Sequence, residues 1–153
     1  HDLARRPDYA PFINDDPDQV LEAYLEDPCT RLLVWEEAGA PAGFALFCTV
    51  GDLSGAVELR RLALAETGRG RGRAFLRTLT DFGFRQLRAE RVWLDASSEN
   101  PRAVATYQKA GFKLEGKLRQ HWYRPALGRA VDLILFGMLR AEWEALEPLP
   151  VRA

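Results

Sequence analysis

Apolar residues recur along the chain at two spacings, and the change between them separates predicted strands from predicted helices. Alternating or continuous β-rich runs predict strands over residues 30–35, 42–50, 57–64, 91–95, 112–122 and 130–138. Helical spacing predicts helices over residues 16–27, 73–88 and 100–109, and a helical turn or two over 141–146. The pattern of residues 2–13 is too weak to assign. The order of the elements favours an α/β or α+β fold with a mixed sheet.

Particular residues mark where these elements bend or end. Arg60 and Arg61 interrupt the alternation of the third strand and predict a β-bulge. Asn100 suits the N-cap of the helix that follows it, and Gly111 suits the left-handed position after its last turn. Asn100 and Tyr107 are seven residues apart, or two helical turns, so we expect them to share one face.

Length and composition narrow the class of protein. The chain has 153 residues, of which 47% are apolar and 28% charged, so we expect one folded domain over residues 1–153. The longest apolar run, residues 43–50, is too short to span a membrane, and the first residues have no apolar core of a signal peptide. The two cysteines, Cys29 and Cys48, predict neither a disulfide scaffold nor a metal site, and reduced thiols suit a cytoplasmic protein.

The net charge of −1 conceals an uneven distribution. Residues 1–66 carry five arginines and thirteen acidic side chains, a balance of −8. Residues 67–153 carry sixteen basic and nine acidic side chains, a balance of +7. The second half therefore favours an anionic ligand, and the first half is suited to attract a cationic amine. Nucleic-acid binding does not follow from this distribution.

A glycine-rich segment between a strand and a helix is the strongest chemical signal. Residues 62–76 read LALAETGRGRGRAFL, with glycines at 68, 70 and 72. Glycine allows positive φ and close backbone approach, and the amides at a helix start point towards one spot. This arrangement predicts an anion site, most often for phosphate, and Arg69, Arg71 and Arg73 add charge beside it.

Other interpretations of this segment remain open. A P-loop requires Lys and then Ser or Thr after its last glycine, whereas this chain has Arg73 and Ala74. A dinucleotide fold requires G-x-G-x-x-G, and the glycines at 68, 70 and 72 have the wrong spacing for it. Glu90 nevertheless lies near the distance expected of the acidic residue of that fold. The remaining interpretations are a short RNA-binding tract, for which six residues are too few, and a simple glycine turn with surface arginines.

Together with the following helix, this segment resembles the GNAT acetyltransferase superfamily. The family pattern is R/Q-x-x-G-x-G/A between a strand and a helix, then N-x-x-A-x-x-x-Y-x-K-x-G-F after the next strand. Residues 100–112 match the second part closely, and the first part has both glycines. Thr67 replaces the usual Arg or Gln, which removes one side chain near the phosphates. The resemblance covers about residues 30–140 and implies a mixed, mostly antiparallel sheet of about six to seven strands flanked by helices.

The end of the chain narrows the resemblance. Asp132, residues 138–140 and Glu142-Trp143 are similar to the branch that includes ribosomal-protein N-terminal and small-amine acetyltransferases.

The family binds acetyl-CoA between splayed strands, which implies roles for the glycine segment. Backbone groups at the end of the strand are expected to pair with the pantetheine arm, at Leu62, Ala63 and Leu64. Amides of the turn and helix start are expected to surround the pyrophosphate, over Gly68, Arg69, Gly70, Arg71, Gly72, Arg73 and Ala74. The side chains of Arg69, Arg71, Arg73 and Arg102 are candidate phosphate ligands, with solvated surface as the alternative for each.

The resemblance also implies that an amine attacks the thioester directly, without a covalent enzyme intermediate. Tyr107 resembles the acid for the leaving thiolate, although a phenol pKa of about 10 exceeds the thiol value of about 8.5. Glu58 is a candidate base through a water, or else an ion-pair partner of an arginine. Asn100 is a candidate for positioning the cosubstrate or a water, and Glu99 and His121 are weaker candidate bases.

The leading hypothesis is an acetyl-CoA-dependent N-acetyltransferase acting on a primary amine of a small molecule or protein. We expect a cytoplasmic monomer or homodimer that needs no metal, nucleic acid or membrane. Four aromatic side chains are candidates for the acceptor pocket or the core, namely Trp93, Trp122, Tyr123 and Trp143. One alternative is a catalytically silent acyl-CoA-binding sensor of the same fold. Another is a nucleotide-binding enzyme that uses the glycine turn.

Overall fold

The computed structural model describes residues 1–148, so the last five residues of the domain expected over 1–153 lie outside the described residues. The helices are α1 (Asp2–Arg5), α2 (Asp18–Glu26), α3 (Arg71–Arg85), α4 (Pro101–Lys109) and α5 (Arg140–Glu144). The strands are β1 (Arg31–Glu37), β2 (Ala40–Cys48), β3 (Ala56–Leu64), β4 (Arg91–Ser97), β5 (Lys113–Arg124) and β6 (Arg129–Leu139). Over residues 1–148, no helix is long and apolar enough to cross a membrane.

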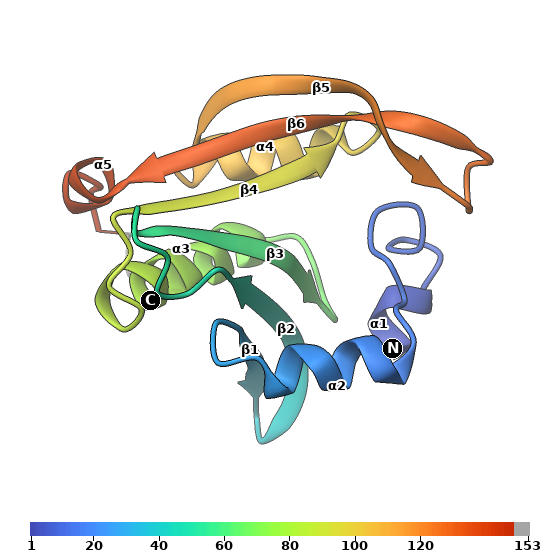
Figure 1. The fold of residues 1–153 in the computed structure, drawn as a ribbon, viewed down its shortest axis with the longest axis horizontal. Helices are drawn as coiled ribbons and strands as arrows, with labels where there is room; N and C mark the ends of the chain where they lie inside the picture. Colours follow the sequence, from blue (N-terminus) through green and yellow to red (C-terminus); the bar gives the residue numbers. More distant parts are fainter. Residues whose placement is uncertain (149–153) are drawn as a thin grey trace.

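The strands form one six-stranded sheet in the order β1-β2-β3-β4-β6-β5. All neighbours pair antiparallel except β3 and β4, which are parallel. In Figure 1, α3 and α4 lie behind the sheet, and α2 lies in front of β1. The mixed, mostly antiparallel sheet flanked by helices confirms the fold class predicted from the sequence.

The hydrophobic core fills the space between the sheet and helices α3 and α4. Phe75 and Leu76 of α3 are at most 2% exposed, and Phe47, Val92 and Phe136 of the sheet are fully buried. Burial of such side chains contributes about 1.5–3 kcal/mol each. The sheet and these two helices therefore form a rigid support for whatever lies at their edges.

An extra residue in β3 changes the course of the sheet. The β2–β3 register passes from Leu46 opposite Arg61 to Phe47 opposite Leu59, so Arg60 is the bulged residue predicted from the sequence. Parallel pairing of β3 with β4 stops after Glu58 and Trp93. Beyond that point the two strands diverge, as Figure 1 shows.

Glycine and asparagine set the ends of α3 and α4. Helix α3 begins at Arg71, two residues earlier than predicted, because Gly70 adopts a φ of +76° and turns the chain directly into the helix. Asn100 caps α4 as predicted, since its Oδ1 accepts a hydrogen bond from Ala103 N–H at 3.1 Å. Gly111 follows α4 with a φ of +103°, as its left-handed position requires.

Residues 6–16, called the N-terminal arm below, form a series of turns next to the diverging ends of β3 and β4. The buried Arg124 of β5 fixes the arm by donating hydrogen bonds to four of its residues. These acceptors are the carbonyls of Ala10 (2.7 Å), Pro11 (2.9 Å) and Ile13 (3.1 Å), and the Asn14 side chain.

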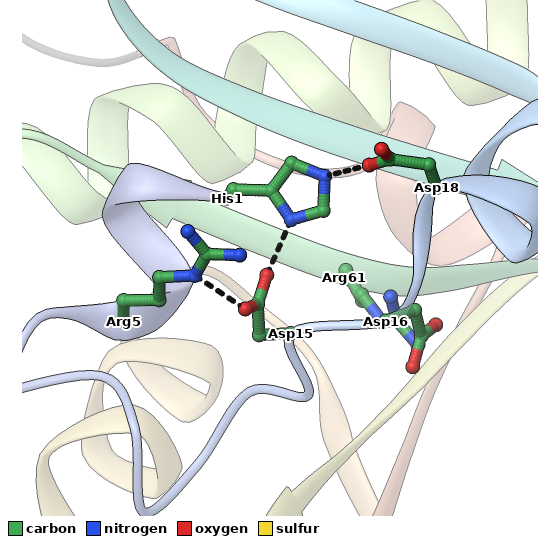
Figure 2. A network of polar contacts seen from close by, with 6 residues as sticks. All are labelled: His1, Arg5, Asp15, Asp16, Asp18 and Arg61. Atoms are coloured by element: carbon green, nitrogen blue, oxygen red, sulfur yellow. Dashed lines mark hydrogen bonds and ion pairs between the residues drawn. The ribbon is translucent and has the colours of Figure 1, made fainter.

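Ion pairs fix the end of the arm. Asp15 accepts hydrogen bonds from His1 at 2.5 Å and from Arg5 at 2.6 Å, and Asp16 lies 2.5 Å from Arg61 of β3 (Figure 2). His1 also contacts Asp18 at 2.8 Å. These acids raise the pKa of His1, Asp15 most strongly. The arm is thus tied both to the first helix and to β3.

We expect Gly111→Ala to lower the free energy of unfolding by about 1–3 kcal/mol, as measured by urea denaturation. The φ of Gly111 strains any L residue, and an added Cβ would lie 2.7 Å from Leu146 Cδ2. The matched control is Gly116→Ala, whose Cβ would meet no atom of residues 1–148 within 4 Å. Equal losses for the two variants would contradict this account of Gly111.

Candidate active site

A cleft of about 960 Å³ opens where β3 and β4 separate. Its walls come from β3, β4, the glycine turn, the first turns of α3 and α4, and the N-terminal arm. Predicted site residues that line it are Glu58, Leu62, Leu64, Gly68, Gly70, Gly72, Arg73, Asn100, Arg102 and Tyr107. Four predicted residues do not line it, namely Ala63, Arg69, Arg71 and Ala74.

The backbone of β3 presents a polar edge to this cleft. Ala65 N–H donates to the Ala42 carbonyl at 2.7 Å, so the backbone groups of Ala65 and of every second residue before it in this part of β3 face β2. Because backbone groups alternate along a strand, those of Leu62 and Leu64 face the side where β4 has diverged. Ala63 instead faces β2, which explains its absence from the cleft.

The arm occupies part of that edge. The Tyr9 hydroxyl accepts a hydrogen bond from Leu64 N–H at 3.0 Å and donates one to the Leu64 carbonyl at 2.8 Å. Arg6 donates to the next carbonyl, that of Ala65, at 2.6 Å. Both polar groups of Leu64 that sequence reasoning reserved for a ligand are therefore bonded to Tyr9.

The glycine turn carries three successive positive φ angles, at Gly68 (+93°), Arg69 (+52°) and Gly70 (+76°). Among residues 1–148, the amides of Gly72 and Arg73 donate to no protein acceptor. Gly72 also lets the turn approach α4, because a Cβ there would lie 3.3 Å from Thr106. The unpaired amides and the positive end of the α3 dipole suit an anion.

Three cations of this region have no ion-pair partner among residues 1–148. Arg73 of α3 and Arg102 and Lys109 of α4 line the cleft without a carboxylate within 4.0 Å. Arg71, in contrast, contacts Glu37 at 2.8 Å and Glu66 at 3.6 Å on the outside of the turn. The basic charge available inside the cleft is thus concentrated at the starts of α3 and α4 and along α4.

Tyr107 points from α4 into the base of the cleft. Its ring packs against Phe136 at 5.7 Å and Phe112 at 6.3 Å between centroids. Its hydroxyl makes no hydrogen bond within the described chain and is not sealed from solvent, so it faces the cleft. Burial, and then the charge of Asp95, raises the pKa of Tyr107 and keeps the phenol protonated.

Glu58 and Asp95 lie on the two separating strands. Glu58 is 8% exposed and pairs with Arg60 at 2.7 Å. Asp95 pairs with no cation among residues 1–148, and burial, aided by the charge of Glu58, raises its pKa to about 6. His121 and Arg60 oppose this increase. Asp95 is therefore a carboxylate poised to exchange a proton near neutral pH.

Sequence reasoning did not single out Asp95, Tyr9 or Lys109. Asp95 follows the buried run RVWL, and an acidic residue at the end of such a strand is the signal that could have identified it. Lys109 belonged to the family motif without an assigned role. Tyr9 lies in the segment that carried no pattern.

The weaker candidates are divided between the cleft and other surfaces. Glu99 lines the cleft and pairs with Arg129 at 2.9 Å, whereas His121 lies outside it. Of the four aromatic candidates, only Trp122 lines the cleft. Trp143 stacks on Phe84 at 5.1 Å. Among residues 1–148, no group of three His, Cys, Asp or Glu side chains forms a metal site.

Comparison with known proteins agrees with this architecture. An uncharacterized N-acetyltransferase of Mycobacterium tuberculosis is 35% identical over 99 residues, covering 61% of this chain and 59% of the relative. A spermidine N(1)-acetyltransferase of Vibrio cholerae is 24% identical over 131 residues, covering 84% of this chain and 75% of the relative. The chain therefore spans about 59% of the length of the mycobacterial relative.

A solved structure shares the fold. The crystal structure of spermidine N-acetyltransferase from Vibrio cholerae in complex with CoA and spermine has a TM-score of 0.74 at 22% identity. The match covers 83% of this chain and 75% of that one. The family model described as the acetyltransferase (GNAT) family matches residues 1–112. This chain belongs to the GNAT family of acetyltransferases.

Proposed function

We propose that this protein is an N-acetyltransferase that moves an acetyl group from acetyl-CoA to a primary amine. The observation that carries the proposal is the separation of unpaired charge within one cleft. Within residues 1–148, three cations of the cleft that have no ion-pair partner lie on α3 and α4, and Asp95, the cleft carboxylate that has none, lies on β4. The phosphates of one ligand would meet the cations of α3 and α4, and the ammonium of a second ligand would meet the carboxylate of Asp95. The names of the relatives, which include spermidine acetyltransferases, support an amine acceptor.

The residues present fit acetyl-CoA at its phosphate end. The free amides of Gly72 and Arg73 and the side chains of Arg73, Arg102 and Lys109 would hold its phosphates. The backbone of Leu62 would meet the pantetheine arm. When bound, acetyl-CoA supplies the thioester whose carbonyl carbon the amine attacks.

Asp95 is the group that we assign to accept the proton of the acceptor ammonium, directly or through one water. Its pKa of about 6 leaves it ionised at neutral pH and makes it a stronger base than an ordinary aspartate. The freed amine nitrogen bonds to the acetyl carbon as the carbon–sulfur bond breaks. Glu58, the base expected from the sequence, is engaged by Arg60, and its charge helps to raise the pKa of Asp95.

Tyr107 is the group that we assign to protonate the departing sulfur. Its hydroxyl faces the cleft, and its raised pKa keeps the proton available. Asn100 caps α4 and so fixes the start of the helix that carries Arg102 and Tyr107. As the amide forms, the nitrogen loses its second proton, which replaces the one that Tyr107 gave to the sulfur, directly or through water. The proton held by Asp95 leaves to solvent, so both groups are restored and the reaction releases one proton overall.

Thermal unfolding with acetyl-CoA, free CoA, NAD and ATP tests the cosubstrate. A ligand at about 100 times its Kd stabilises the fold by about 2.7 kcal/mol. We expect acetyl-CoA and free CoA to stabilise the fold and NAD and ATP not to do so. We then expect CoA thiol to be released from acetyl-CoA only when an amine is present. Binding without transfer would identify a CoA-binding module instead, and stabilisation by NAD or ATP would indicate a nucleotide site.

We expect Tyr107→Phe to lower kcat by about 10²–10⁴-fold, because the ring remains in place while the proton donor is lost. The Kd of CoA should stay unchanged. Tyr123→Phe is the control, since Tyr123 is 62% exposed and lies outside the cleft. An undiminished kcat in Tyr107→Phe would remove this residue from the mechanism.

Asp95→Asn should stabilise the fold at about pH 7.5 by about 1–3 kcal/mol and abolish transfer. The carboxyl pKa is about 6 when folded and 3.8 as the reference value, so the folded state binds this proton more tightly. The contribution of this carboxyl to wild-type stability should therefore fall as pH rises from about 4 to about 6, and the variant's advantage should disappear below about pH 4. Urea denaturation across this range measures the difference, and an advantage that does not depend on pH would refute the cause assigned to it.

Tyr9→Phe should lower the Kd of CoA by about two- to tenfold, as one net hydrogen bond predicts. In wild type the Tyr9 hydroxyl must release Leu64 before that backbone edge can bind the pantetheine arm. Isothermal titration of wild type and variant measures the change. Weaker binding by the variant would show that the hydroxyl contacts the ligand rather than competing with it.

A further inference from the structure

The acceptor side of the cleft has its own set of charges. It is lined by Phe12, Ile13 and Asn14 of the arm, Glu58, Arg60 and Arg61 of β3, Asp95 and Ser97 of β4, and Glu99, Trp122 and Leu133. We call this set the acceptor side, and none of its residues belongs to the glycine turn, α3 or α4. Its charges determine which amines it can hold, because an ammonium leaving water needs a carboxylate that is free to receive it.

Most carboxylates of the cleft are already neutralised. Glu58 lies 2.7 Å from Arg60, and Glu99 lies 2.9 Å from Arg129. Asp8, where the arm meets the rest of the cleft, lies 2.6 Å from Arg6. Among the cleft carboxylates of residues 1–148, Asp95 alone has no cation within 4.0 Å. The acceptor side therefore offers one negative charge.

The cations of β3 reinforce this limit. Arg61 is held by Asp16 of the arm at 2.5 Å (Figure 2), and Arg60 is held by Glu58. A second ammonium on the acceptor would have to break one of these pairs and would leave an arginine facing it. That exchange gives no net gain of attraction and adds repulsion between like charges.

Apolar side chains from the arm and from β5 also line the acceptor side. Phe12 and Ile13 come from the arm, and Trp122 from β5. Arg124 connects them, because its guanidinium lies 3.9 Å from the Trp122 ring and also donates to the Ile13 carbonyl at 3.1 Å. These surfaces suit a hydrocarbon body rather than a chain of further charges.

We infer that the acceptor is a small monoamine, with one ammonium for Asp95 and an apolar body for Phe12, Ile13 and Trp122. This inference rests on the proposed function and narrows its substrate class to alkyl and arylalkyl amines. It distinguishes this chain from relatives named for spermidine, whose substrate carries several positive charges.

The first test compares acceptors at saturating acetyl-CoA by release of CoA thiol. The kcat/KM for phenethylamine and hexylamine should exceed that for putrescine and spermidine by about tenfold or more. Equal or greater kcat/KM for spermidine would overturn the inference and leave the proposed function standing. Transfer to none of the four amines, despite binding of acetyl-CoA, would overturn the proposed function and this inference together.

The second test creates a second free carboxylate. Arg60→Gln releases Glu58, and Arg129→Gln releases Glu99 at the more exposed rim, where folding tolerates the change. Each variant should raise the kcat/KM of putrescine relative to phenethylamine by about fivefold or more. Lys113→Gln, which frees Glu142 away from the cleft, should leave the ratio unchanged. An unchanged ratio in both arginine variants would show that free carboxylates do not determine the acceptor.

Discussion

The single extra residue in β3 is the constraint on which the cleft depends. With Arg60 bulged, β3 and β4 keep only three parallel pairs and then part. Had the pairing continued, Leu62 and Leu64 would bond to β4 and no polar edge would face a ligand. The bulge therefore converts the middle of a sheet, usually its most protected part, into a binding surface.

Separated strands leave a gap in the core, and α4 fills it with Tyr107. The ring packs on Phe136 and Phe112, while the hydroxyl faces the cleft. The same burial that stabilises the ring raises the pKa of the phenol. One side chain thus closes the hydrophobic core and presents a protonated donor. Removing the hydroxyl should therefore affect the proton donor, whereas removing the ring should also affect the packing of the core.

Local patterns in the sequence were sufficient to predict the elements from α2 to α5, the bulge and the ends of α4, whereas α1 lies in the segment left unassigned. The glycine turn, Asn100 and Gly111 all act on their near neighbours, so the residue types alone carried the information. Pairing between distant residues was not predictable in this way. Arg71 was expected near the phosphates but meets Glu37, because the β1–β2 hairpin ends beside the start of α3.

The N-terminal arm gave no signal for a different reason. Its place is set by Arg124, more than a hundred residues away in the sequence, which donates to backbone carbonyls that any residue could supply. The sequence did not indicate Asp95, because what distinguishes it is that the other carboxylates of the cleft form ion pairs. Only when Glu58 and Glu99 are seen to be paired does one unpaired carboxylate stand out.

The buried Arg124 and the half-buried Asp95, which carry opposite charges, remain without an ion-pair partner among residues 1–148, and each would stabilise the other if they met. Arg124 instead uses neutral carbonyls to hold the arm, and the charges that act on Asp95 come from Glu58, His121 and Arg60. A cation beside Asp95 would lower its pKa and repel an incoming ammonium. Keeping the two apart costs stability at neutral pH, and that cost is the physical condition for the role that we propose for Asp95, which is to attract an amine and take its proton.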